Sequence, residues 1–147
     1  MTMYRRTVRT SVILASGAVL FLAAGRGCVI PQANSPQYQA IAATDARALI
    51  QNRTADPNFI IIDVRTPAEF ATGHIENAVN ICVTCTDPAF SDAIAGLEKT
   101  RTYFVYCGSQ HRSPTAIAAM QQAGFTSLYE LTGGLATWVA AGLPVVQ

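Results

Sequence analysis

Short apolar segments alternate with longer amphipathic segments along most of the chain. Residues 59–64 form a run of apolar, mainly β-branched residues with one aspartate, which is typical of a strand buried on both faces of a parallel sheet. Three further strands are predicted at residues 78–82, 102–106 and 127–131, and residues 38–41 are predicted to add an edge strand.

Helices are predicted between these strands. Thr66, Pro67 and Glu69 form a capping box with proline at the first helical position, so a short helix is expected to begin here and to end at Gly73. The other helices are predicted at residues 45–51, 87–97, 114–122 and 135–141.

The alternation of strands and helices predicts an α/β fold. Right-handed crossovers between parallel strands place helices on both faces of a central, mostly parallel sheet. Ligands bind such sheets at the carboxyl ends of the strands. The residues that follow each predicted strand are therefore the candidates for function, at positions 63–65, 82–85, 107–112 and 132–134.

The first 27 residues have the character of an export signal. Arg5, Arg6 and Arg9 precede an apolar run at residues 12–24, and small residues follow it. The run is shorter than the ~20 residues needed to span a bilayer. We therefore expect an exported protein of the periplasm or cell envelope, with an uncleaved membrane anchor as the alternative.

Cys28 lies directly after this segment and is a candidate lipidation site. In bacterial lipoproteins a cysteine just after the apolar run is lipidated and becomes the mature N-terminus, which would tether this protein to the membrane. Residues 28–39 include a polar stretch with two prolines and are predicted to be a tether, and residues 40–147 are predicted to form one domain.

Composition and charge narrow the classes of function. A chain of 147 residues with 50% hydrophobic and 13% charged residues is expected to form one globular domain. Ten basic and nine acidic residues give a net charge of +1, which excludes a broad basic surface for nucleic acid. Without the four arginines of residues 1–27 the balance is about −3. An anion site would then have to be a local feature.

The segment after the strand at residues 102–106 has the character of an anion-binding loop. It consists of Cys107, Gly108, Ser109, Gln110, His111, Arg112 and Ser113, and proline follows at once. Inward-pointing loop amides, a helix N-terminus and Arg112 all favour a thiolate, so Cys107 is the candidate nucleophile. The alternative is a buried, inert cysteine at the end of a strand.

Two segments of the chain resemble the rhodanese-like (sulfurtransferase) family. The first runs from Asp63-Val64-Arg65 to Ile81, and the second from Tyr106-Cys107 to Trp138 with the glycine pair at 133–134. The resemblance implies the three-layer fold of that family and a catalytic Cys107. This cysteine would take a sulfane sulfur from thiosulfate or a related anion, hold it as a persulfide and pass it to cyanide or a thiol, without metal or organic cofactor.

Two residues depart from the family pattern. Gln110 stands where many members have glycine, and glycine takes a positive φ at lower cost than glutamine. We therefore expect a strained or reshaped loop. Asn77 also replaces a usual glycine, which is a mild change because asparagine tolerates the left-handed region.

Charged residues near the loop have less specific assignments. The resemblance implies that Asp63 and Arg65 orient the loop, and a structural ion pair is the alternative. Glu69 is explained by helix capping, and His74 is expected to pack between helix and strand. His111 is expected to contact the donor or to titrate near neutral pH, and a solvent-facing side chain is the alternative.

Cys82 and Cys85 form a second pair at the carboxyl end of a strand. Three alternatives remain open: a structural disulfide, which export would permit, a redox pair or sulfur acceptor that resolves the Cys107 persulfide, and unpaired thiols. Two thiols without nearby histidines are too few for a closed zinc site.

Two other functions compete with catalytic sulfur transfer. One is a low-turnover persulfide carrier or binding module. The other is a phosphatase of the related cell-cycle type, whose loop has five residues between cysteine and arginine. Here only four residues separate Cys107 from Arg112, which suits a single sulfur atom better than a phosphate group.

Overall fold

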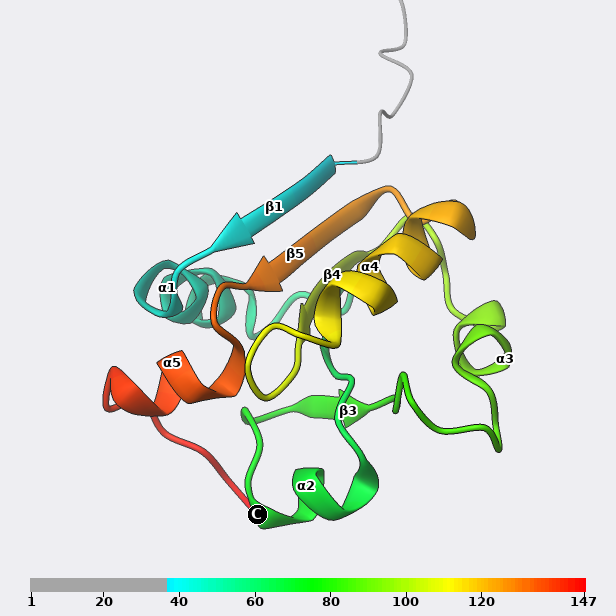
Figure 1. Cartoon of the computed structure of the whole chain (residues 1–147). Helices are drawn as coiled ribbons and strands as arrows, with labels where there is room; N and C mark the ends of the chain where they lie inside the picture. The colour runs from blue at the N-terminus through cyan, green and yellow to red at the C-terminus, as the bar shows by residue number, and fades with distance from the viewer. Residues whose placement is uncertain (1–36) are drawn as a thin grey trace, which may run out of the picture. The chain divides into compact units, whose positions relative to one another are not determined.

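The computed structural model describes residues 37–147. Its centre is a sheet of five strands, β1 (Gln37–Ile41), β2 (Phe59–Asp63), β3 (Ala78–Asn80), β4 (Thr102–Tyr106) and β5 (Ser127–Leu131). All neighbours pair in parallel, in the order β1-β5-β4-β2-β3 (Figure 1). The predicted export signal, Cys28 and the tether up to residue 36 lie outside the described residues and stay predictions.

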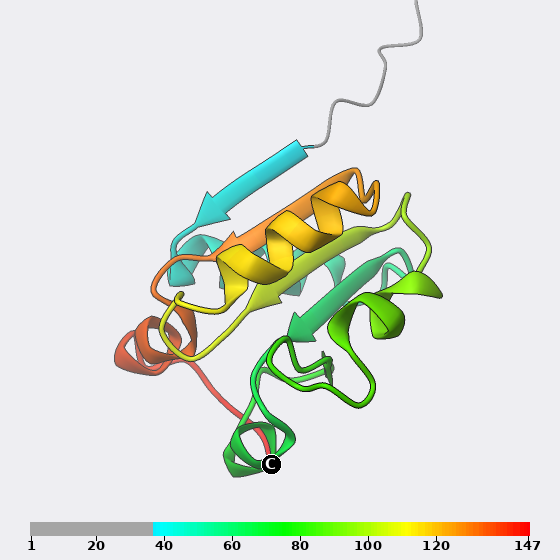
Figure 2. The same cartoon turned by 45° about the vertical axis from the view of Figure 1, so that its right-hand side comes forward.

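Helices cover both faces of the sheet, so the predicted three-layer α/β fold is confirmed (Figure 2). The five helices of the described residues are α1 (Ala43–Arg53), α2 (Pro67–Thr72), α3 (Phe90–Ala95), α4 (Ser113–Gln122) and α5 (Gly134–Ala140). Helices α3 and α4 lie on one face, α1 and α5 on the other, and α2 beyond the carboxyl ends of β2 and β4. None of these helices is long and apolar enough to cross a membrane.

Strand β4 is buried on both faces, as its apolar sequence predicts. Successive side chains of a strand point to opposite faces. Tyr103 and Val105 therefore join the core under α3 and α4, whereas Phe104 and Tyr106 join the core under α1 and α5. Cys107 continues this alternation and lies on the α4 side of the sheet.

Helix α2 forms as its capping box predicts. The Thr66 hydroxyl accepts a hydrogen bond from the backbone N–H of Glu69, and the Glu69 carboxylate accepts one from the backbone N–H of Thr66. Pro67 occupies the first helical position and Gly73 caps the end. The reciprocal bonds satisfy two N–H groups that a helix start otherwise leaves without partners.

Several predicted boundaries differ from the structure. The helix predicted at residues 45–51 spans residues 43–53, and the helix predicted to end at residue 97 ends at Ala95. Residues 37–39, assigned to the tether, belong to β1, because they pair with residues 127–129 of β5. The strand predicted at residues 78–82 ends at Asn80, because the chain turns at residues 82–85. The helix predicted from Asp87 begins at Phe90, because residues 86–89 form a turn around a cis Asp87-Pro88 peptide.

Candidate active site

Cys107 lies where β4 passes into the loop before α4. The side chain has no exposed surface, and α4 begins at Ser113, so residues 108–112 form the whole connection. Such a short turn from a buried strand to a helix N-terminus directs several backbone N–H groups to one point. Burial alone would suit an inert cysteine, so the polar surroundings of the sulfur decide its character.

The start of α5 holds the carbonyls of this loop away from the thiol. The backbone N–H of Leu135 donates to the carbonyl of Cys107 at 2.8 Å, and that of Ala136 donates to the carbonyl of Gly108 at 2.9 Å. With these carbonyls turned outward, the backbone N–H groups of Ser109, Arg112 and Ser113 help to lower the pKa of the Cys107 thiol.

These donors favour the thiolate form of Cys107. Burial is the largest single influence and raises the pKa of the thiol, because it penalises the charged form. The Ser113 hydroxyl, with its oxygen 3.5 Å from the sulfur, and the loop amides lower it more in total. The net pKa is below the ordinary value, as expected for a nucleophile rather than for an inert core thiol.

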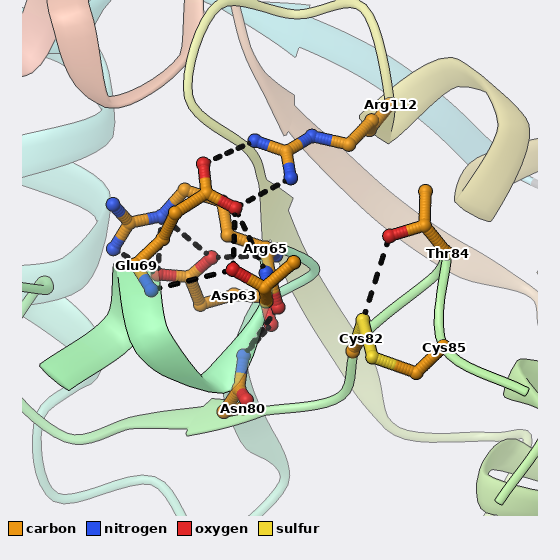
Figure 3. Close-up of a disulfide and its surroundings, with 9 residues drawn as sticks. Asp63, Arg65, Glu69, Asn80, Cys82, Thr84, Cys85 and Arg112 are labelled. Carbon is orange, nitrogen blue, oxygen red and sulfur yellow. Dashed lines mark hydrogen bonds and ion pairs between the residues drawn. A yellow bond between two sulfur atoms is a disulfide. The ribbon is translucent and has the colours of Figure 1, made fainter. Parts of the chain in front are cut away.

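Arg112 is paired with Glu69 rather than directed at the thiol (Figure 3). Its two terminal nitrogens donate to the Glu69 carboxylate at 2.6 and 2.7 Å. This bidentate pair raises the pKa of Arg112 and, with the bonds from Thr66, lowers the pKa of Glu69 to about 2. The assignment of Glu69 to helix capping alone was incomplete, because the same carboxylate also fixes the arginine of the loop.

Asp63 and Arg65 form a buried ion pair, one of the alternatives left open by the sequence. The Asp63 carboxylate accepts from the backbone N–H of Arg65 at 2.9 Å and from its guanidinium at 2.6 Å. The guanidinium also donates to the carbonyl of Gly73, and the Asn80 amide donates to the carbonyls of Asp63 and Arg65. The pair therefore joins β2, α2 and β3 below the loop (Figure 3).

Of the two outcomes expected for the loop, strained or reshaped, the structure shows strain, because Gln110 has φ of 64°. Its side-chain oxygen accepts a hydrogen bond from the backbone N–H of Gly133 at 2.8 Å. The left-handed conformation costs about 1–2 kcal/mol for a residue with a Cβ. The hydrogen bond to Gly133 offsets part of this cost. Asn77 has φ of 61°, in agreement with its expected tolerance.

The two histidines take peripheral places. His111 is exposed, and its Nδ1 lies 2.9 Å from the Ser109 hydroxyl at the outer rim of the loop. His74 stacks on Phe70 with ring centroids 3.7 Å apart, so the helix side of its predicted packing between helix and strand is confirmed. The exposed position of His111 corresponds to the solvent-facing alternative.

Cys82 and Cys85 form a disulfide in the turn after β3. The bond lies beside the cluster of Asp63, Glu69 and Arg112, and the Cys82 sulfur is 3.6 Å from the Thr84 hydroxyl (Figure 3). In this state neither sulfur is a thiol that could accept a sulfane sulfur.

One buried polar residue near the site was missed by the sequence analysis. Glu130 on β5 is 1% exposed, and its carboxylate accepts hydrogen bonds from the hydroxyls of Ser113 and Tyr38. The pattern contained a usable indication, because Glu130 and the buried Leu128 are two residues apart and so share a face of the strand. A glutamate on an apolar strand face needs a partner.

Comparison with known proteins identifies the family. The rhodanese-like domain family matches residues 43–141. A sulfurtransferase of Allochromatium vinosum is 32% identical over 102 residues, which cover 69% of this chain and 92% of that protein. The chain belongs to the rhodanese-like domain family.

Other relatives agree with this assignment. The thiosulfate sulfurtransferase GlpE of Pseudomonas aeruginosa is 32% identical over 104 residues, covering 71% of this chain and 86% of that protein. The crystal structure of a rhodanese-related protein from Thermoplasma volcanium matches with a TM-score of 0.58 and 28% identity, covering 74% of this chain and 98% of that one. The rhodanese-like fold and membership of a sulfurtransferase family are thus established.

Because α5 approaches the loop closely, residue 134 is expected to require glycine, and this can be tested. A Cβ at this residue would lie 2.5 Å from the Cys107 carbonyl oxygen, and φ is +65°. We expect Gly134→Ala to reduce the free energy of unfolding by about 3 kcal/mol and to abolish sulfur transfer by the rhodanese-like domain. Gly142→Ala is the matched control, because φ is +69° but nothing lies within 4 Å. Urea unfolding should show a loss of only about 1 kcal/mol there, and equal losses would contradict the argument.

The strain at Gln110 can be separated from its hydrogen bond by two substitutions. Gln110→Ala keeps the positive φ and loses the bond to Gly133, so we expect the free energy of unfolding to fall by about 1 kcal/mol. Gln110→Gly loses the same bond and relieves the strain, so it should be close to wild type. Thermal and urea unfolding check this order; a glycine variant no more stable than the alanine variant would show an unstrained loop.

The Glu69–Arg112 pair predicts a dependence of stability on pH. Because folding lowers the pKa of Glu69 from its usual 4.5 to about 2, the pair stabilises the fold above pH 4.5 and loses this effect as the pH falls toward 2. The carboxylate is 39% exposed, so we expect less than about 1 kcal/mol. Glu69→Gln keeps a side chain that can cap α2 but carries no charge. The free energy of unfolding, measured with urea at each pH, should therefore fall less between pH 4.5 and pH 2 than in the wild type. Glu98→Gln, at the exposed Arg101 pair, should change it less.

Proposed function

We propose that Cys107 transfers a sulfane sulfur from thiosulfate, or a related anion, to a thiophilic acceptor through a persulfide intermediate. The observation that carries this proposal is the Cys107 thiol at the turn into α4, where the Ser113 hydroxyl lies 3.5 Å from the sulfur and the loop amides help to lower the pKa of the thiol. Membership of the rhodanese-like family supports it.

The proposed reaction has two displacement steps. In the first, the Cys107 thiolate attacks the outer sulfur of thiosulfate, a sulfur–sulfur bond forms, and sulfite leaves with the electron pair of the broken bond. In the second, cyanide or a thiolate attacks the outer sulfur of the persulfide, and the Cys107 thiolate leaves. The protein ends unchanged, so no external oxidant or reductant is needed.

The loop supplies the charge stabilisation that both steps need. A terminal persulfide sulfur is anionic, and preorganised backbone N–H groups stabilise such a charge without rearrangement. Arg112 uses one N–H on each terminal nitrogen to hold Glu69, and a guanidinium has five N–H donors. The remaining N–H groups of Arg112 can bind thiosulfate or the leaving sulfite while the ion pair with Glu69 stays intact.

Asp63 and Arg65 would contribute by position rather than by chemistry. The Cδ of Arg65 lies 3.8 Å from the place of a Cβ on Gly108, so the buried ion pair packs directly under the loop. We assign both residues to orienting the loop, as the family resemblance implied. The Cys82–Cys85 disulfide supports the proposed export, because such bonds persist in oxidising compartments.

A persulfide carrier with low turnover is the second candidate. The observation that favours it is the complete burial of the Cys107 side chain, which suits release of sulfur to a partner that opens the loop. The two candidates share the persulfide and differ in whether small molecules complete the cycle.

Replacement of the nucleophile tests the proposed function. We expect Cys107→Ser to abolish thiocyanate formation from thiosulfate and cyanide, because serine cannot hold the sulfane sulfur. The double variant Cys82→Ser, Cys85→Ser is the matched control and should retain turnover. Thiocyanate formation that survives in Cys107→Ser would remove Cys107 from the mechanism. A mass gain of one sulfur on Cys107 without turnover would instead favour the carrier.

A further inference from the structure

The buried carboxylate of Glu130 has an unusual set of partners. It lies on β5, beside β1 and β4, and is 1% exposed. The four ion pairs of residues 37–147 do not include it. Its two oxygens instead accept hydrogen bonds from the hydroxyls of Ser113, at 2.6 Å, and Tyr38. A buried carboxylate that is held only by neutral hydroxyls is costly, which calls for an explanation.

The register of the sheet brings Glu130 to the site. Ala40, Glu130 and Val105 are paired across β1, β5 and β4, so their side chains share one face. Cys107 lies two residues beyond Val105 on the same face, and Ser113 begins the helix that covers it. Glu130 therefore lies one hydroxyl group away from the nucleophile.

The hydroxyl of Ser113 connects the two groups. Its oxygen is 3.5 Å from the Cys107 sulfur and 2.6 Å from Glu130 Oε1. A serine hydroxyl has one proton and two acceptor sites. When Ser113 donates to Glu130, it can accept the thiol proton. When Ser113 donates to a Cys107 thiolate, Glu130 Oε1 keeps its hydrogen bond only if Glu130 is protonated.

We propose that Cys107 and Glu130 share one proton through Ser113, so that Glu130 takes up the thiol proton as the nucleophile forms. The S–H bond of Cys107 breaks while an O–H bond forms on Ser113, and the original Ser113 O–H bond breaks while one forms on Glu130 Oε1. The electron pair stays on sulfur, and nothing is oxidised or reduced. Glu130 is a positioning residue here, because it acts on Cys107 through Ser113.

The other groups that face this pair are compatible with the transfer. Tyr38 approaches from β1, and its pKa is raised to about 12 by burial and by Glu130, so it remains a donor at neutral pH. From the loop before α4, Arg112 interacts electrostatically with Cys107, but its charge is balanced by Glu69. Cys107 itself directly follows β4. The role of this proton transfer, which is to form the nucleophile, rests on the proposed function. The proton sharing itself can be measured without any sulfur donor.

Titration of the Cys107 thiolate tests the sharing. The thiolate is followed by its ultraviolet absorbance, as the difference between each protein and its Cys107→Ser counterpart. In the wild type, we expect two steps, because one shared proton leaves a partial thiolate population before the last proton dissociates. Glu130→Gln should show a single step, since glutamine preserves the hydrogen bond from Ser113 but cannot take up a proton. An unchanged two-step titration in Glu130→Gln would overturn the proposal.

Infrared spectroscopy of the folded wild-type protein gives a second, independent measurement. The carboxylic acid band of Glu130, assigned by its loss in Glu130→Gln, should appear where the partial thiolate exists and disappear in the second step. It should be absent from Cys107→Ser at the same pH, because no thiol proton is available there. A band that persists in Cys107→Ser would show that Glu130 is protonated without a proton from the Cys107 thiol. That result would also overturn the proposal.

Two further variants sharpen the interpretation. Ser113→Thr keeps the hydroxyl and should retain both steps. Tyr38→Phe removes a hydrogen bond that favours the carboxylate form of Glu130, so it should increase the thiolate fraction in the first step. Two steps in a protein that forms no thiocyanate would contradict the proposed function alone. A single step in a wild type that does form thiocyanate would contradict this inference alone.

Discussion

The candidate site depends on two backbone hydrogen bonds between segments far apart in the sequence. The first N–H groups of α5 hold the carbonyls of Cys107 and Gly108, and this leaves the loop amides free to face the sulfur. The contact is close enough that position 134 has no room for a side chain. The nucleophile and the glycine pair before α5 are therefore one structural unit.

The two arginines beside this unit are each paired with a carboxylate. Arg65 is neutralised by Asp63, and Arg112 by Glu69. The attraction of the loop for an anion consequently comes mainly from fixed backbone dipoles, not from unpaired cations. This agrees with the acidic balance expected for the chain without its first 27 residues, because a local cradle works independently of net charge.

The sequence predicted the secondary-structure elements that depend on neighbouring residues. The apolar run of β2, the strand sequence of β4 and the capping box of α2 each specify their element through neighbouring residues, and the structure confirms them. The composition of the loop after β4 located Cys107, and the family resemblance agreed with it. The second role of Glu69 and the network of Glu130 were not found, because both depend on which side chains meet across the sheet. Such contacts follow from strand order and register, which pattern analysis leaves open.

The burial of Cys107 links these observations. Enclosure by loop and core gives the amides their strength, because hydrogen bonds to an anion are stronger away from water. The same enclosure leaves the thiol without exposed surface, so its proton cannot pass directly to solvent. An acceptor inside the protein resolves this conflict, and Glu130 is reached through a single hydroxyl. Glu130, a buried carboxylate without a cation among residues 37–147, is unfavourable by itself and is then explained by the chemistry of its neighbour.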